Sequence, residues 1–211
     1  YRIETYELPK GVNFEASGLA VTAEGKLAVG LRKGEVWIEG KKGFQLFASG
    51  LHEILGLAWH DGALYATQRA EVTKLRDTDG DGKADNSKIF YQGTDVNSAL
   101  GISLVGNKVI VSCSPNVFIF TDENGDDVPD KKEVFFQGIQ GLQHDHGMHT
   151  FVFGPDGRLY FNFGNEGKSL LNAAGDTVVD VHGHKVVTNG KPFREGMVMR
   201  ANIDGSQVEV L

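Results

Sequence analysis

Two stretches of the chain repeat each other, 45 residues apart. Residues 71–93 read EVTKLRDTDGDGKADNSKIFYQG, and residues 116–138 read NVFIFTDENGDDVPDKKEVFFQG. They align without a gap and share a Val, three Asp, a Gly and a closing Phe-x-Gln-Gly. Each stretch places an acidic segment between two apolar segments. We therefore interpret each as the outer hairpin of a repeated β unit, with an elaborated turn between its strands.

A second hairpin pattern occurs four times and gives the repeat its length. In each case an apolar run, a short turn and another apolar run follow one another, over residues 18–29, 55–65, 100–111 and 151–161. The turn glycines of these hairpins are 37, 44 and 51 residues apart. This spacing is near the roughly 40 to 50 residues of a four-stranded propeller blade.

The rest of the chain supports an all-β interpretation. There are 28 Gly and only 5 Pro, and only Ser169 to Ala174 offers even a short helical pattern. We predict a single β-propeller domain over residues 1–211. Its four-stranded blades are expected at about residues 12–50, 51–93, 94–138 and 139–211.

The first nine residues fit none of these units, although they alternate like a strand. Propellers commonly close by letting a terminal strand complete the last blade. We therefore predict that residues 1–9 complete a blade beyond Leu211. The alternative is a four-bladed ring that needs no such strand.

Composition limits the classes of partner. The chain has 211 residues, 23% charged and 40% hydrophobic, with a net charge of −7, so a nucleic-acid partner is not expected. No apolar run approaches the roughly 20 residues of a membrane span, so we predict none in this segment. The single cysteine, Cys113, cannot form an internal disulfide or a haem attachment, and we predict a buried strand position for it.

The two acidic segments have the ligand spacing of a calcium loop, with oxygen-bearing residues at positions 1, 3, 5 and 9 and a carbonyl at position 7. The ligands predicted in the first loop are Asp77, Asp79, Asp81, the Lys83 carbonyl and Asp85. Those predicted in the second loop are Asp122, Asn124, Asp126, the Val128 carbonyl and Asp130. Glu133 stands at the twelfth position of the second loop, but Lys88 stands there in the first, so the likeness to an EF-hand ends at the loop.

The alternative is that both loops are solvated turns, which are also rich in Asp, Asn and Gly. Their recurrence at one place in two repeats favours calcium. Like charges in one loop repel unless a cation holds them, so we expect the ions to stabilise the hairpins. Such sites fill most readily where calcium is millimolar, which predicts a periplasmic or secreted protein.

Three histidines gather directly before the strand that opens the fourth repeat, in residues 143–149, QHDHGMH. In a propeller this loop lies at the mouth of the central channel. His146 could act as a base, and the adjacent carboxylate of Asp145 could orient it. The same residues could instead bind a transition metal, or could be histidines hydrogen-bonded in a tight loop. We interpret His182 and His184 as solvated turn residues and assign no role to His52 and His60.

Several of these residues resemble a known family. Asp145-His146, followed by residues 155–160, PDGRLY, and 164–167, GNEG, resembles the soluble quinoprotein glucose dehydrogenase and sorbosone dehydrogenase family. Members are six-bladed propellers that use pyrroloquinoline quinone (PQQ), so the resemblance implies that the four blades of this chain are part of a six-bladed ring. Residues 55–60, LGLAWH, and 196–206, GMVMRANIDGS, are similar to further stretches of that family. The chain also resembles the planctomycete-type "membrane-bound dehydrogenase" branch, in which the propeller is often joined to helical repeats and a c-type haem domain.

The resemblance implies an oxidoreductase that acts on a sugar or another alcohol. It makes His146 the base that takes the hydroxyl proton and places Asp145 and His149 at the quinone. It also implies a c-type cytochrome domain, or the remaining blades of the same protein, as partners. Two positions depart from the family, with Leu51 and Leu170 where glutamines are expected, and the cations that grip the quinone belong to later blades.

Two other functions remain open. One is a non-catalytic, calcium-stabilised propeller that binds a glycan or a protein. The other is a metal-dependent lactonase-type hydrolase, which needs several carboxylates at the channel mouth, where Asp145, Glu15 and Glu53 are the candidates. Propellers host all three functions, so the fold alone does not choose between them.

Overall fold

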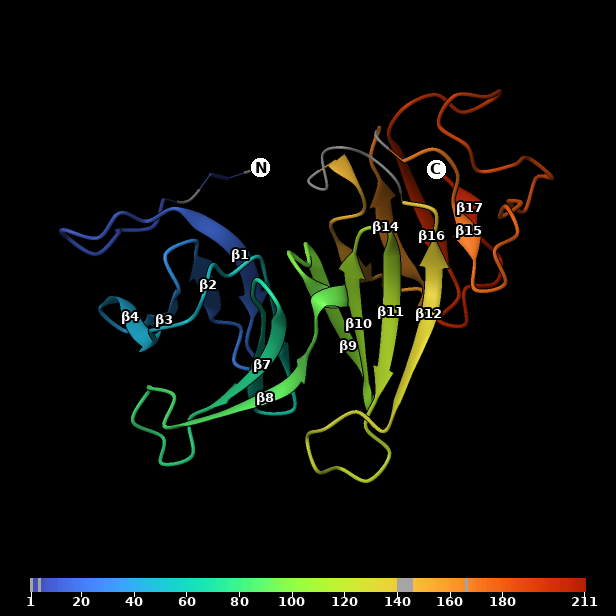
Figure 1. Ribbon diagram of the computed structural model, residues 1–211. Coiled ribbons are helices and arrows are strands. Elements are labelled where there is room, and N and C mark those ends of the chain that lie inside the picture. The colour runs from blue at the N-terminus through green and yellow to red at the C-terminus, as the bar shows by residue number, and fades with distance from the viewer. Residues whose placement is uncertain (1, 4, 140–145, 166) are drawn as a thin grey trace.

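The computed structural model describes residues 2–3, 5–139, 146–165 and 167–211, which form four antiparallel sheets (Figure 1). The first two sheets contain β1 (Ala16–Val21), β2 (Leu27–Leu31), β3 (Glu35–Gly40) and β4 (Gly43–Ala48), then β5 (Gly56–His60), β6 (Ala63–Thr67), β7 (Glu71–Arg76) and β8 (Asn86–Gln92). The third contains β9 (Gly101–Val105), β10 (Lys108–Cys113), β11 (Asn116–Thr121), β12 (Lys131–Gln137) and β15 (Leu171–Asn172). The fourth contains β13 (Phe151–Phe153), β14 (Leu159–Phe163), β16 (Met197–Ala201) and β17 (Glu209–Val210). A 3₁₀ turn, η1 (Thr94–Val96), precedes the third sheet.

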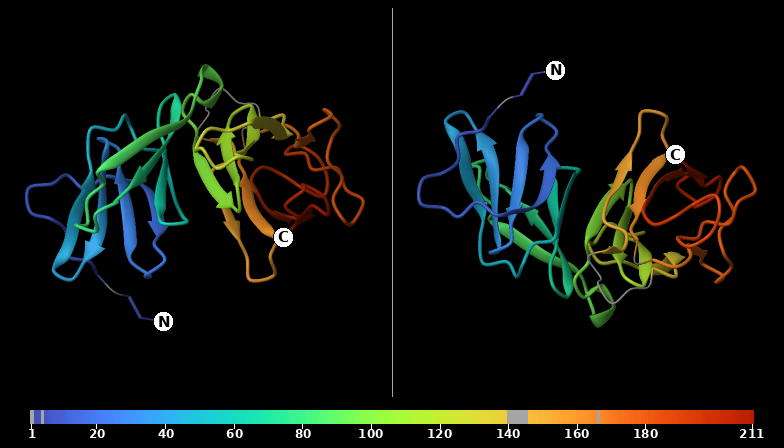
Figure 2. Two further views of the ribbon diagram at one scale, coloured as in Figure 1. Left: turned by 90° about the horizontal axis from the view of Figure 1, so that it is seen from below. Right: turned by 90° about the horizontal axis from the view of Figure 1, so that it is seen from above.

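The sheets are arranged as successive propeller blades. Innermost strands of neighbouring blades contact each other, β1 with β5, β5 with β9, and β9 with β13. Figure 2 shows the four sheets following one another around an arc in chain order. The all-β propeller predicted from the repeats is therefore confirmed, with four blades in this chain.

Three apolar cores hold the arc together, one between each pair of neighbouring blades. Strand β10 has neighbours on both sides, and Val109, Ile110 and Val111 along it are all buried. In the fourth blade, β14 instead alternates, with Leu159, Phe161 and Phe163 buried and the residues between them partly exposed. One face of the fourth blade thus packs against the third, and its other face is more open.

The repeat seen in the sequence is also present in the positions of the outer strands. The β7–β8 and β11–β12 hairpins have the same bounds when shifted by 45 residues. Both carry a register shift at the same place, after Val72 and after Val117, and the first blade has one after Val36. The acidic segments lie between the two outer strands of their blades, as predicted.

The segment from Ser169 to Ala174, where the sequence offered a short helical pattern, forms no helix. This segment contains β15, which pairs with β12 through Asn172↔Phe136 and Leu171↔Gln137, so the third sheet has five strands. The side chain of Asn172 accepts hydrogen bonds from the amides of Ala174 and Asp176. An Asn that bonds the backbone ahead of it makes a turn and competes with a helix.

Two further predictions concern single segments. The described part of residues 1–9 contains no strand, and its role in a blade beyond Leu211 stays a prediction. Cys113 is buried at the end of β10, as predicted, and burial raises the pKa of its thiol to about 11. Among the described residues, no helix has the length and hydropathy needed to cross a membrane.

Candidate functional site

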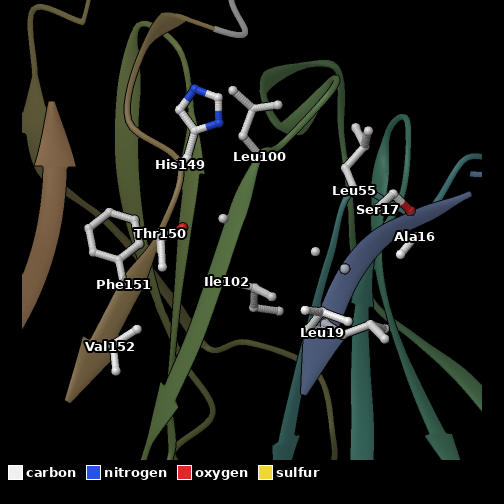
Figure 3. Close-up of a pocket in the computed structure, with 14 residues that line it drawn as sticks. Ala16, Ser17, Leu19, Leu55, Leu100, Ile102, His149, Thr150, Phe151 and Val152 are labelled. Carbon is white, nitrogen blue, oxygen red and sulfur yellow. The ribbon is translucent and has the colours of Figure 1, made fainter. Parts of the chain in front are cut away.

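A cavity of about 450 Å³ lies along the propeller axis, between the innermost strands of all four blades (Figure 3). Its walls are mostly apolar, with side chains such as Leu19, Leu55 and Ile102 around it. Polar groups come from Ser17, His149 and Thr150. The cavity is therefore the axial channel predicted from the fold, and its volume falls within the roughly 300–1,000 Å³ typical of small-molecule sites.

Glycines on the inner strands let the blades approach this closely. A Cβ at Gly101 would overlap the carbonyl oxygen of His149, and one at Gly18 would lie 3.0 Å from the amide nitrogen of Leu57. The backbones around the channel thus pack against one another directly, and the wall has little room to rearrange.

Residues 148–150, at the end of the histidine segment, are hydrogen-bonded to two blade side chains, Ser112 and Asn162, which the sequence pattern did not single out. Ser112 on β10 donates to the carbonyl oxygen of Met148 at 2.6 Å. Asn162 on β14 accepts from the amides of both His149 and Thr150, each at 3.2 Å. These bonds hold His149 at the channel, where its ring lies near Leu100 (Figure 3).

His146 has a different environment. Its Nδ1 lies 2.9 Å from Oδ1 of Asn165, and a Cβ at Gly164 would overlap the His146 carbonyl oxygen. Because the amide oxygen of Asn165 only accepts, Nδ1 carries the proton and Nε2 keeps its lone pair in the neutral ring. Within the described part of the chain, His146 is not among the residues that line the axial cavity. Asp145 lies outside the described residues.

A charged cluster at the channel mouth was not foreseen. Glu53 accepts from Nε of Arg32 on one carboxylate oxygen, at 3.3 Å, and from Nε of Arg69 on the other. Arg69 also donates to Oγ of Ser98 at 2.8 Å. These side chains line a second cavity of about 420 Å³, which shares Ala16, Ser17, Leu55 and Leu100 with the axial one. Each Arg is separated in sequence from Glu53 by a strand or more, so only the fold brings them together.

The first acidic loop holds its side chains close together. One carboxylate oxygen each from Asp77, Asp79 and Asp81 can be chosen so that all three lie within 4.8 Å of one another. Asp85 faces Thr78 instead, accepting from its amide at 2.9 Å and its hydroxyl at 2.6 Å, and these bonds hold the pKa of Asp85 below its usual value. Its ligand role, like that of the Lys83 carbonyl, stays a prediction.

The second loop repeats this geometry. Asp122 accepts from the amide of Gly125 at 2.7 Å, and Asp77 accepts from the amide of Gly80 at the same distance. The side chains of Asn124 and Asp126 accept from amides two residues ahead, at 2.8 and 2.9 Å, and Asp130 accepts from the amide of Glu123 at 2.6 Å. Such bonds form in any Asx turn, yet each carboxylate keeps further lone pairs for a cation.

Asp127 joins the second loop to the preceding blade through two ion pairs. Asp127 pairs with Lys74 and with Arg76, both on β7, and the Arg76 bond is 2.7 Å long. The Lys74 side chain is 9% exposed and that of Asp127 is 15% exposed. The first loop has Gly82 at the equivalent place, so this clasp exists in one loop only.

His182 and His184 lie in a turn, as predicted. His182 and His184 are exposed, and their amides donate to Oδ1 of Asp180 at 3.0 and 2.7 Å in a tight turn. Two of the hydrolase candidates are within the described residues and have partners: Glu53 pairs with the two arginines, and Glu15 accepts from the side-chain amide of Asn13 at 2.8 Å.

Three solved structures show what this fold is similar to. An oxidoreductase of Thermus thermophilus, described as a glucose dehydrogenase, matches with a TM-score of 0.55 at 13% identity, over 94% of this chain and 80% of that one. The PQQ-bound aldose sugar dehydrogenase of Streptomyces coelicolor matches with a TM-score of 0.52 at 14% identity, over 95% and 78%. An auxiliary nutrient binding protein of Bacteroides thetaiotaomicron matches with a TM-score of 0.55 at 13% identity, over 93% and 57%.

At such identities these structures show the fold alone, which is that of propellers including PQQ-dependent dehydrogenases. None of the curated proteins matches the chain. One family model covers residues 34–202, which is most of the sequence. The chain therefore belongs to the family described as a domain of unknown function, DUF7133.

Proposed function

We propose that the chain is a calcium-binding, quinoprotein-like dehydrogenase propeller that oxidises a sugar or another alcohol, with His146 as the base. One observation carries the proposal: Nδ1 of His146 lies 2.9 Å from Oδ1 of Asn165, so that, as far as the described residues go, Nε2 is the ring nitrogen left to accept a proton. The ring belongs to the loop that enters the innermost strand of the fourth blade, and His149 of the same loop lines the axial cavity.

The base has a simple task. A hydroxyl whose oxygen lies against Nε2 of His146 gives its proton to that atom while its carbon loses a hydride. The positive charge that develops on the ring is stabilised by the Nδ1–H bond to the neutral amide oxygen of Asn165, which also fixes the orientation of the ring. Asp145 is proposed as a second support on the basis of the family resemblance.

The cavity fits a planar, polar cofactor in its general chemistry. Apolar walls at Leu55, Leu100 and Phe151 suit a flat ring system, and His149 and Thr150 offer polar atoms at one side. PQQ, when bound, would supply the electron acceptor for the reaction. His149 is the described residue that we propose to contact it.

The two acidic loops are proposed as calcium sites that stiffen the outer hairpins. The proposed ligands in both loops are oxygen atoms, the donors that Ca²⁺ prefers, and three carboxylates of the first loop already lie close together. This supports a protein that works where calcium is millimolar, in the periplasm or outside the cell.

Replacing the proposed base tests the mechanism. His146→Ala should lower the kcat of dye-linked alcohol oxidation by about 10²- to 10⁴-fold, the usual contribution of a general base, with little change in Tm. His182→Ala removes an exposed histidine of a distant turn and should leave kcat unchanged. Equal rates for His146→Ala and the native chain would remove His146 as the base.

A second function, binding without catalysis, is favoured by the similarity to the nutrient binding protein. A propeller of this kind would retain a sugar in the channel without oxidising it. Calorimetry with a sugar panel, run beside the dye assay, separates the two functions. Binding with no quinone-dependent turnover would favour the second.

A further inference from the structure

Two arginines at the channel mouth, Arg32 and Arg69, share one carboxylate partner, Glu53, among the described residues. The Glu53 carboxylate between them is 18% exposed, whereas the side chains of Arg32 and Arg69 are 68% and 43% exposed. A ligand that enters this cavity therefore meets guanidinium groups and not the carboxylate that they cover.

Counting only contacts with the described residues, both arginines keep donors for such a ligand. Arg32 uses Nε for Glu53, and Arg69 uses Nε for Glu53 and one terminal nitrogen for Ser98. The terminal nitrogens of a guanidinium form a fork that matches the two oxygens of a carboxylate. The other acidic residue of the cavity lining, Glu15, is bonded to Asn13.

The backbone at the centre of the cluster is unusual. Glu53 has φ +52°, a left-handed conformation that a residue other than glycine rarely adopts. The hydrogen bond from Arg69 holds the pKa of Glu53 below its usual value, so the carboxylate stays charged and fixes both arginines at neutral pH. Strained residues held by their surroundings cluster at functional sites.

We propose that Arg32 and Arg69 form a carboxylate-binding site at the channel mouth, with Glu53 as the residue that positions them. Its ligand is a small carboxylated molecule, whether an acidic sugar that enters the channel or a carboxylate of the quinone. The axial and mouth cavities share Ser17 and Leu55, so a ligand held here reaches toward the channel. The site does not depend on turnover and is compatible with either proposed function.

Calorimetry on the full chain tests the site with three ligands: glucuronate, glucose and PQQ. Glucuronate or PQQ should bind at least about tenfold more tightly than glucose, because a charge-assisted hydrogen bond is worth a tenfold change or more in affinity. Arg32→Gln should lower the affinity for the carboxylate ligand by about tenfold or more. The Arg32 side chain is mostly exposed and makes one hydrogen bond to Glu53, so circular dichroism should show a folded variant.

Lys33→Gln is the matched control, because Lys33 is exposed, adjacent in sequence and outside the cavity lining. Lys33→Gln removes the same charge as Arg32→Gln. It should leave the affinity for glucuronate and for PQQ within about twofold of the native value. Loss of glucuronate binding alone assigns the site to a substrate, and loss of PQQ binding alone assigns it to the cofactor. The proposal is overturned if neither carboxylate binds more tightly than glucose, if Arg32→Gln binds like the native chain, or if Lys33→Gln weakens binding equally. If the chain binds glucuronate through Arg32 but reduces no dye, the carboxylate-binding site stands and the proposed dehydrogenase activity is overturned.

Discussion

The contact between His146 and Asn165 joins two residues 19 positions apart. The sequence pattern suggested His146 as a base, because histidine is the side chain that can take a proton near neutral pH. It gave no reason to pair that ring with Asn165, since such a contact depends on how the fourth blade folds. The same holds for Asn162, which looks like one polar residue between Phe161 and Phe163 but fixes the backbone of the histidine loop.

Substitution of Asn165 tests the positioning role. Asn165→Ala should lower kcat by about tenfold and leave KM nearly unchanged, because the ring loses its fixed tautomer but the substrate contacts remain. Asn165→Asp keeps an oxygen acceptor at the same place and should retain most of the rate. If both variants lose activity equally, the oxygen of Asn165 does not orient the ring.

At the scale of elements, the acidic loops were the most predictable part of the structure. Each is a local segment whose turn chemistry is encoded by its own Asp, Asn and Gly residues, so one repeat predicted the other. The short helical pattern at Ser169 to Ala174 was misleading for the opposite reason. Residues Leu171 and Asn172 become a strand only because the edge of β12, about 35 residues earlier in the chain, offers them a partner.

Calcium should stabilise the chain through both loops. At a calcium concentration about 100 times the Kd of a loop, binding adds about 2.7 kcal/mol. Asp81→Ala and Asp126→Ala should therefore each lower Tm by about 5–10 °C in calcium and change it much less in excess chelator.

Asp204→Ala is the matched control for the calcium experiment. Asp204 accepts from Ser206 in a turn outside both loops, so its loss should have the same effect with and without calcium. A loop variant that behaves like this control would refute the calcium assignment.

The Asp127 clasp predicts a pH dependence. Burial alone would raise the pKa of Asp127, but the hydrogen bonds from Lys74 and Arg76 outweigh it and hold the pKa below its usual value. Because the folded-state pKa lies below the unfolded one, the stabilisation is fully present above about pH 4 and is lost as the pH falls through the folded value. Asp127→Asn should cost about 2 kcal/mol at neutral pH and progressively less in acid.

Chemical unfolding in chelator from pH 7 to pH 3 measures this effect. Glu123→Gln removes the same charge from the same loop, but the pair that it forms with Lys131 is more than half exposed, so stability should hardly change. A loss of stability for Asp127→Asn that does not depend on pH would show that the ion pairs are not its source.

At the scale of the whole molecule, blade number followed from the sequence because each blade has its own turn glycine. The existence of the central channel could also be predicted from the sequence, since the innermost strands of any propeller surround its axis. The cluster of Arg32, Glu53 and Arg69 could not be predicted, because its members come from different strand ends that only the complete arc brings to one mouth. The six-bladed ring and the planctomycete-type branch stay predictions.

The most direct test of the proposed function is dye-linked oxidation of a panel of sugars and alcohols by the full chain in calcium, measured before and after PQQ is added. We expect no dye reduction without the quinone, and a rate that appears with the quinone and depends on the alcohol. A rate that stays at zero after the quinone is added, while calorimetry shows a bound sugar, would contradict the dehydrogenase and leave a binding propeller.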